Sequence, residues 1–565
     1  MVTSITLQAL ACASVLAYVS AQNNDLPVVD LGYQLQRASS YFEAQEESQT
    51  SYYNFSNIRF AAPPTGELRW RAPQAPAVNR DVIDDGNSIE RVCPQANPGW
   101  QVLIPNFLVD YLSGQNFTPP ANTTFSPPPK DPRETEDCLF LDVFTPKEVF
   151  EQAGKGYGAP VLVWVYGGGY TAGTKAASGS PSGLLDRSFT APTTDGVIYV
   201  AMNYRLGVYG WASGPTIQTD GVANAGLLDQ RFALEWVQQN IAKFGGDPNR
   251  VTVFGESAGG GSIMHQITAY GGMKGPVPFQ QAVPQSPGWF PVVSTYAQET
   301  TFQNFLRHAG VSSLEDARQL DEETLYKANQ QQVGLDSPYG LFTYGPVVDG
   351  EFVPALPGQL LSYGQFDQSL RVMVGYNGDE GLLFTSPYLT NDTAVDNYFV
   401  EKFPNTPSDV IKYITEVLYP ATFDGSQPYT DSIGRAALAL SELGFTCNAN
   451  YLDRAFLNQT YSYYFTVPPA LHGQDISYTY YTGNTTLTPS LNPLGVQNAT
   501  VAISMQEWIT SFAQLGRPVG PYGTPMFNTY GPNAGIVEIN GTNISPATDP
   551  AANARCRWWQ QALYY

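Results

Sequence analysis

Alternating strands and helices constrain the fold of this chain more than any other feature of its sequence. Continuous apolar runs, rich in β-branched and aromatic residues, predict buried strands at residues 160–166, 196–203, 250–254, 371–375 and 461–467. Apolar residues at helical spacing predict a helix over residues 223–244, and a second helix is expected from Ala258 onward. Strands that alternate with helices form a largely parallel sheet, which helices cover on both faces. We therefore expect an α/β fold with long loop and helical insertions.

A short serine motif, Gly255-Glu256-Ser257-Ala258-Gly259, lies between the strand expected at 250–254 and the helix that follows it. This strand–turn–helix context is what a nucleophile elbow requires, because the sharp turn lifts the serine hydroxyl above the sheet at a helix N-terminus. An ordinary glycine-rich turn has the same local pattern. The function of the motif therefore depends on whether a base and an acid can reach Ser257.

Three consecutive glycines, Gly167-Gly168-Gly169, follow the strand predicted at 160–166. Without side chains in the way, their backbone N–H groups can point into a site, as an oxyanion hole requires, together with the N–H of Ala258. A flexible loop and a phosphate cradle are the alternatives. A Walker-type loop would need a Lys-Ser/Thr ending, which this run lacks.

Histidine is rare in this chain, so a candidate general base can be found by elimination. The three histidines are His265, His308 and His472. His265 lies on the helix expected after Ser257, where its ring points away from the serine, and His308 is typical of a surface or helix-end residue. In hydrolases with a nucleophile elbow, the serine comes first, then the acid, then the histidine. Only His472, in the turn after residues 461–467, leaves room for an acid in between.

The supporting acid should follow a strand between the serine and this histidine. Asp379 and Glu380 come directly after the strand expected at 371–375, and Asp349 follows another apolar run. Each could orient the imidazole, because each supplies a carboxylate. Spacing alone leaves all three candidates open.

The N-terminus and the cysteines predict a secreted protein. Residues 1–21 have the pattern of a signal peptide, with Val19-Ser20-Ala21 as a small-x-small cleavage site. Four cysteines remain in the expected mature chain, residues 22–565, and suggest two disulfides with three possible pairings. After the signal, no apolar stretch reaches the ~20 residues of a membrane span. Nine Asn-x-Ser/Thr sequons fit a glycosylated surface: Asn54, Asn116, Asn122, Asn391, Asn458, Asn484, Asn498, Asn540 and Asn543.

Composition narrows the classes of partner. The net charge of −22 repels phosphate backbones, which argues against binding to nucleic acid. Hydrophobic residues make up 43% of the chain and charged residues only 14%, so a large core can form. No two cysteines have a C-x-x-C spacing, so no metal site is expected. No feature of the sequence indicates an oligomeric state.

Several long motifs, in order along the chain, resemble the type-B carboxylesterase family of α/β-hydrolases, which includes cholinesterases, lipases and general carboxylesterases. The motifs are RFAAPPTGELRWRAP (59–73), EDCLFLDVFTP (136–146), NYRLGVYG (203–210), NAGLLDQ (224–230), FGGDPNRVTVFGESAGGG (244–261) and HGQDI (472–476). The resemblance covers nearly the whole mature chain. It implies one α/β-hydrolase domain over residues 22–565, with a mostly parallel central sheet.

The resemblance also implies roles that spacing leaves open. In the family's D-E-G turn the glutamate is the acid, which implies a triad of Ser257, His472 and Glu380. The glycine run implies Gly168 and Gly169 as oxyanion donors, beside the N–H of the residue after the nucleophile.

The order of the cysteines implies the disulfides Cys93–Cys138 and Cys447–Cys556. The first would close a loop over residues 93–138 at the place of the family's lid or gorge rim. Its apolar stretch, residues 102–112, is either the apolar face of a lipase lid or the core of the loop.

The implied function is that of a secreted serine hydrolase, which cleaves small-molecule or lipid esters through an acyl-enzyme and needs no metal or organic cofactor. Trp289 and Phe290 are expected to line the acyl pocket, because they follow the family-like Pro284-Gln285-Ser286. Two alternatives remain: a lipase that acts on long-chain acylglycerols, and a non-catalytic binding or adhesion protein of the same fold.

Overall fold

The computed structural model describes residues 26–45, 49–86, 89–119, 125–190, 195–292, 294–456, 460–485 and 494–565. The predicted signal peptide, residues 1–21, lies outside these ranges, and so do the sequon residues Asn122 and Asn458. Within the described ranges, no helix is long and apolar enough to cross a membrane.

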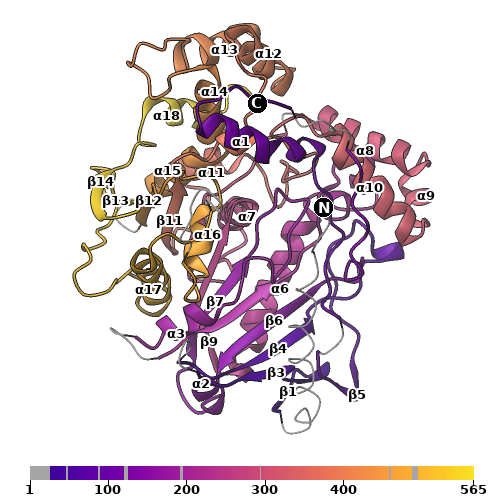
Figure 1. Cartoon of the computed structure of the whole chain (residues 1–565). Helices are drawn as coiled ribbons and strands as arrows, with labels where there is room; N and C mark the ends of the chain where they lie inside the picture. The colour runs from indigo at the N-terminus through magenta and orange to yellow at the C-terminus, as the bar shows by residue number, and fades with distance from the viewer. Residues whose placement is uncertain are drawn as a thin grey trace, which may run out of the picture.

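One large sheet of 11 strands organises the molecule (Figure 1). In spatial order its strands are β14 (Ile544–Thr548), β13 (Gly535–Ile539), β12 (Thr460–Phe465), β11 (Arg371–Asn377), β10 (Gln281–Gln285), β9 (Gly246–Glu256), β7 (Ala159–Val165), β8 (Ile198–Met202), β6 (Phe140–Pro146), β4 (Tyr52–Arg59) and β3 (Ser40–Phe42). Neighbours from β13 to β8 run parallel, and antiparallel strands extend the sheet at both edges. A smaller sheet joins β1 (Val28–Asp30), β2 (Gln34–Arg37) and β5 (Asn79–Asp84).

Five strands of the parallel region, β7, β8, β9, β11 and β12, confirm the strands predicted from apolar runs. The other two, β13 and β10, were not predicted; the sequence of β10, QAVPQ, is short, begins and ends with glutamine and contains Pro284. Strand β10 is nevertheless fully buried between β9 and β11. Its neighbours, rather than its own composition, make it a strand.

Helices cover both faces of the sheet, as the alternating pattern predicts. Every residue of β7 is buried, which requires cover on both sides. In Figure 1, α17 (Ala499–Leu515) lies on one side of the sheet, and α6 (Ala225–Asn240) and α7 (Ala258–Ile267) lie on the other. The helix predicted over 223–244 is therefore confirmed, with its last turn continuing as the 3₁₀ helix Ile241–Phe244.

The remaining helices are shorter or belong to the insertions. They are α1 (Ile104–Leu112), α2 (Lys147–Glu151), α3 (Ser182–Arg187), α4 (Gly207–Trp211), α5 (Pro215–Gln218), α8 (Thr295–Ala309), α9 (Leu314–Arg318), α10 (Glu322–Asp336), α11 (Pro357–Ser362), α12 (Asp392–Lys402), α13 (Ser408–Lys412), α14 (Ser432–Ser441), α15 (Cys447–Ala455), α16 (Gln474–Thr479) and α18 (Ala554–Gln560). In Figure 1, α12, α13 and α14 form a layer at the top, above α15 and the ends of β11 and β12. We call α12 to α14 the helical cap.

Two disulfides connect the insertions to the rest of the fold, in the pairings that the resemblance implies. Cys93 bonds to Cys138 across 45 residues, and Cys447 bonds to Cys556 across 109 residues. In the chain-entropy model, loops of these lengths correspond to roughly 4–5 kcal/mol of stability each.

The apolar stretch inside the first disulfide loop forms α1, which has two apolar faces. Phe107 is fully buried against Leu382 and Leu471 and anchors the helix to the body of the protein. On the outer face, Val109 and Leu112 are 67% and 49% exposed. The stretch therefore contributes both to the loop core and to an exposed apolar surface.

Candidate active site

The serine motif forms a sharp turn between β9 and α7. Ser257 has φ 58° and ψ −123°, a backbone conformation that residues other than glycine rarely adopt. A Cβ atom added to Gly255 or Gly259 would lie 2.4 or 2.0 Å from the carbonyl oxygen of Val165. Only glycine fits at these two positions, so the motif has the geometry of a nucleophile elbow.

Ser257, His472 and Glu380 form a continuous chain of polar contacts. His472 Nε2 lies 2.8 Å from Ser257 Oγ, and His472 Nδ1 lies 2.5 Å from Glu380 Oε2. Glu380 is fully buried, and only 9% of His472 is exposed. The serine follows β9, the glutamate follows β11 and the histidine follows β12, so the ends of three parallel strands bring these side chains together.

The other acids considered from the sequence have different partners. Asp349 Oδ2 accepts a hydrogen bond of 2.7 Å from Asn224 Nδ2. Asp379 lies beside Glu380 in sequence, but its backbone N–H donates to the carbonyl of Ala470, and burial raises the pKa of its side chain to about 6. Of the three candidates, Glu380 is the one that contacts the imidazole.

The other two histidines also have partners of their own. His265 is buried on α7, where its Nδ1 lies 2.7 Å from the carbonyl oxygen of Gly261. His308 Nε2, near the end of α8, lies 3.0 Å from Asp336 Oδ2. Both positions agree with the roles expected from the sequence.

Two residues that sequence reasoning did not single out hold Glu380 in place. Ser286 Oγ donates a hydrogen bond of 2.6 Å to Glu380 Oε1, and the backbone N–H of Asn377 donates to the same oxygen at 2.5 Å. Ser286 follows β10, and Asn377 is the last residue of β11. The available signal was their position at the carboxyl ends of adjacent parallel strands, but β10 was not predicted.

A second carboxyl group lies next to the imidazole. Glu256 Oε1 is 3.3 Å from His472 Nε2; burial raises the pKa of Glu256, and the charge of a protonated His472 opposes this effect. Burial lowers the pKa of His472, but the nearby charges of Glu256 and Glu380 outweigh burial and raise it to about 9. The surroundings of the ring therefore stabilise the imidazolium form.

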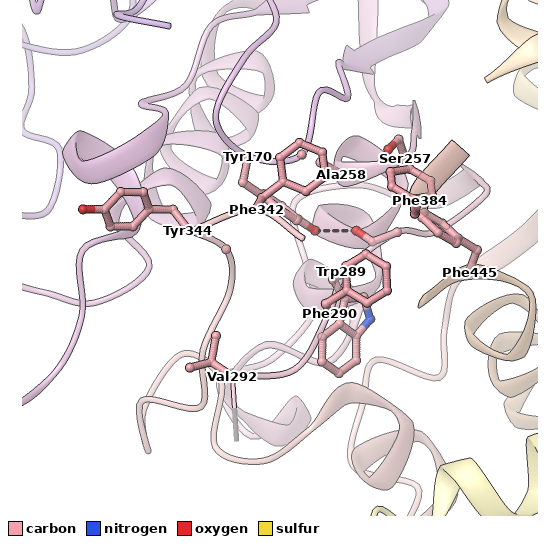
Figure 2. Close-up of a pocket in the computed structure, with 13 residues that line it drawn as sticks. Tyr170, Ser257, Ala258, Trp289, Phe290, Val292, Phe342, Tyr344, Phe384 and Phe445 are labelled. Carbon is pink, nitrogen blue, oxygen red and sulfur yellow. Dashed lines mark hydrogen bonds between the residues drawn. The ribbon is translucent and has the colours of Figure 1, made fainter. Parts of the chain in front are cut away.

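A small cavity of about 40 Å³ adjoins Ser257 (Figure 2). Its wall is mostly aromatic, from Tyr170, Trp289, Phe290, Phe342, Phe384 and Phe445. Trp289 and Phe290 line the same cavity as Ser257, and their role as an acyl pocket stays a prediction. The rings of Phe445 and His472 lie 4.4 Å apart, so this wall also contacts the imidazole.

Comparison with known proteins places this site in a family. A sequence profile described as "Carboxylesterase family" matches residues 42–559. The chain belongs to the carboxylesterase family. This carboxylesterase is 39% identical over 560 residues to "Carboxylesterase patB" of Penicillium expansum, which covers 96% of each chain. It is 34% identical over 394 residues to "Secreted triacylglycerol lipase LIP1" of Gibberella zeae, which covers 66% of this chain and 63% of that protein.

A solved structure agrees over the whole fold. The structure titled "Crystal Structure of Aspergillus niger EstA" matches this carboxylesterase with a TM-score of 0.77 and 25% sequence identity, over 95% of this chain and 98% of that one. The predicted α/β-hydrolase fold is therefore confirmed. The family and these relatives together make the chain a carboxylic ester hydrolase.

The glycine run of this carboxylesterase lies beside the cavity. Gly168 and Gly169 have φ of 120° and 64°, and the carbonyl of Gly168 accepts a hydrogen bond of 3.0 Å from the N–H of Ala172. Gly169 and Ala258 line the cavity next to Ser257. The glycine run and the start of α7 thus line the same cavity as Ser257.

Proposed function

We propose that the protein is a secreted esterase that hydrolyses carboxylic esters through an acyl-enzyme on Ser257. The observation that carries this proposal is the contact of His472 with both Ser257 Oγ, at 2.8 Å, and Glu380, at 2.5 Å. Contacts at hydrogen-bonding distance from nucleophile to base and from base to acid are the basis of triad catalysis.

In the first step, Ser257 Oγ attacks the ester carbonyl carbon while its proton passes to His472 Nε2. The oxyanion is held by the N–H groups of Ala258, Gly168 and Gly169. The bond to the alcohol then breaks, and the alcohol leaves with the proton from the imidazole. Water next donates a proton to the imidazole and attacks the acyl carbon, which frees the carboxylic acid and Ser257. The Glu380 carboxylate orients the ring and stabilises its charged form, and no step requires a cofactor.

The cavity favours short acyl groups over long chains. The cavity beside Ser257 is narrow and has a mostly aromatic wall, which restricts the size of an acyl group that can enter it. The exposed apolar face of α1 supports the second candidate, a lipase, because such a face can contact a lipid surface. We rank the esterase first, because the cavity at the nucleophile limits the acyl group directly.

Two observations support secretion. The structure contains two disulfides, Cys93–Cys138 and Cys447–Cys556, and disulfides persist in oxidising compartments. Relatives named "Secreted triacylglycerol lipase LIP1" and "Secreted lipase" are similar to this chain. We also propose that residues 22–565 form one domain, whose large sheet carries all three triad residues.

Hydrolysis of p-nitrophenyl esters from acetate to palmitate, with wild type and Ser257→Ala side by side, tests the proposal. We expect wild type to prefer acetate and butyrate, and Ser257→Ala to lose activity by a factor of at least about 10⁴. A Ser257→Ala enzyme with wild-type turnover would refute the mechanism.

Activity that rises sharply above the solubility limit of tributyrin would favour the lipase instead. The role of the pocket is tested separately with Trp289→Ala, because removal of a wall residue enlarges the cavity. We expect this variant to accept longer acyl chains. An unchanged chain-length preference would exclude Trp289 from the acyl pocket.

A further inference from the structure

Lys402, the last residue of α12, has an unusual position for a lysine. Its side-chain nitrogen is buried, although the residue as a whole remains partly exposed. Lysine side chains normally do the reverse, with the carbon chain buried and the ammonium group in water. Within the described part of the chain, Lys402 Nζ has no hydrogen-bond acceptor and no carboxylate partner.

The ammonium group lies directly behind the wall of the active-site cavity. Lys402 Nζ is 4.2 Å from the ring centre of Phe290 and 5.8 Å from the ring centre of Tyr398. Phe290 lines the cavity next to Ser257, and Figure 2 shows it beside Trp289. The Phe290 ring therefore borders both the ammonium group and the cavity, and a substrate group in the cavity reaches the ammonium only when this ring moves aside.

Other hydrogen-bond donors near this wall also have no acceptor. Tyr398 Oη and Trp289 Nε1 are buried and have no partner among the described residues. Tyr398 lies one helical turn before Lys402 on α12, and it packs against the same aromatic cluster as Phe290. A single acceptor group from a ligand, placed beside Lys402 Nζ and Tyr398 Oη, would satisfy both donors.

A purely structural role does not explain the lysine. Burial lowers the pKa of Lys402 to about 7, and no nearby carboxylate opposes this effect. Cation–π contacts with Phe290 and Tyr398 offset part of the cost of burying the ammonium group, but an apolar side chain of similar size would not carry that cost. The position therefore fits a function in recognition better than one in packing.

We propose that Lys402, assisted by Tyr398, binds a carboxylate at the far end of the substrate's acyl group, so that the enzyme favours monoesters of dicarboxylic acids. This inference rests on the proposed function of the same site. The net charge of −22 opposes the approach of an anion, so the preference must come from short-range contacts in this subsite. A carboxylate next to the ammonium would replace the missing partner and form a charge-assisted hydrogen bond.

Ethyl hydrogen glutarate and ethyl pentanoate test this inference, because their acyl chains have equal length and differ in the terminal carboxylate. We expect wild type to have the higher kcat/KM for the glutarate ester. In Lys402→Met, the ratio of the two kcat/KM values should fall by about tenfold or more. The control is Lys412→Met at the exposed end of α13, which should leave the ratio unchanged. An equal ratio in wild type and Lys402→Met would overturn the inference, even if both hydrolyse ethyl pentanoate well.

Binding of glutarate itself provides a readout that does not depend on catalysis. We expect glutarate to raise the Tm of Ser257→Ala, and to raise it less or not at all when Lys402→Met is added. If wild type hydrolyses no ester, the proposed function fails, and the glutarate measurement alone decides the inference. No rise in Tm, or an equal rise in both proteins, would overturn it.

Discussion

Two buried charged groups at or near the site, the carboxylate of Glu380 and the ammonium of Lys402, differ in their hydrogen-bond partners. Glu380 follows β11 on the sheet; it is fully buried, accepts hydrogen bonds from Ser286 and Asn377, and contacts His472. Lys402 belongs to the helical cap, and its nitrogen is buried with no acceptor among the described residues. The strand ends of the sheet therefore complete their own polar network, whereas the cap holds a buried donor that has no acceptor among the described residues. Under our proposals, the first group belongs to the part of the site that performs chemistry and the second to the part that selects substrate.

The largest expected effect concerns the satisfied group. Glu380→Gln removes the negative charge that stabilises the imidazolium and should lower kcat by a factor of about 10³–10⁴. The measurement is steady-state hydrolysis of p-nitrophenyl acetate, with circular dichroism as the control for folding. A loss of less than about tenfold would mean that Glu380 is not part of the mechanism. The contrast between Glu380 and Lys402 would then no longer separate catalysis from substrate selection.

A smaller effect is expected from the residue that holds Glu380. Ser286→Ala removes one of its hydrogen bonds but leaves the N–H of Asn377, so kcat/KM should fall by about tenfold. Ser286→Thr keeps a hydroxyl and is the conservative comparison. If Ser286→Ala has wild-type kcat/KM, the network around Glu380 is not needed to position it.

The pH dependence of kcat/KM should reflect the pKa of His472, which the two neighbouring carboxyl groups raise. Catalysis requires the neutral imidazole, and the pKa of His472 is raised to about 9. Activity is therefore expected to be low at acidic pH and to rise through a midpoint above the ordinary histidine value of 6.5. Glu256→Gln removes one of the charges that raise this pKa, so the midpoint should move to lower pH. The profile of kcat/KM from about pH 5 to 10 measures this, and an unchanged midpoint would contradict the role of Glu256.

The smallest effect concerns the unsatisfied group. Lys402→Met removes a buried ammonium without a partner and should raise Tm by about 1–2 °C in the absence of ligand. The same variant is expected to lose the response to glutarate. A clear fall in Tm would show that the ammonium stabilises the fold, and the contrast with Glu380 would no longer hold.

The sequence predicts the parallel strands, and the residues at their carboxyl ends, much better than it predicts the helical cap. Apolar runs locate β7, β9, β11 and β12 because buried parallel strands have a strong local pattern. The elbow and His472 follow from motif, chain order and elimination. The choice of Glu380 over Asp379 and Asp349 needed the resemblance to the family, since all three supply a carboxylate after an apolar run.

The contacts that sequence reasoning missed all join distant segments. Ser286 contacts Glu380 across 94 positions, and Glu256, the last residue of β9, contacts His472 in the turn after β12. Lys402 lies on a largely polar helix, and its burial arises only because α12 packs over Phe290, 112 positions earlier in the chain. No periodicity in a single segment records such contacts, so they could not be predicted without the tertiary structure.

Covalent labelling of the nucleophile tests the central claim most directly. A p-nitrophenyl alkylphosphonate mimics the tetrahedral intermediate and transfers its phosphonyl group to an activated serine. Mass spectrometry of the digested protein should locate one adduct, on Ser257, and labelling should be strongly reduced in His472→Ala. An ester-hydrolysing enzyme that carries no adduct on Ser257, or that is labelled at another residue instead, would contradict the account.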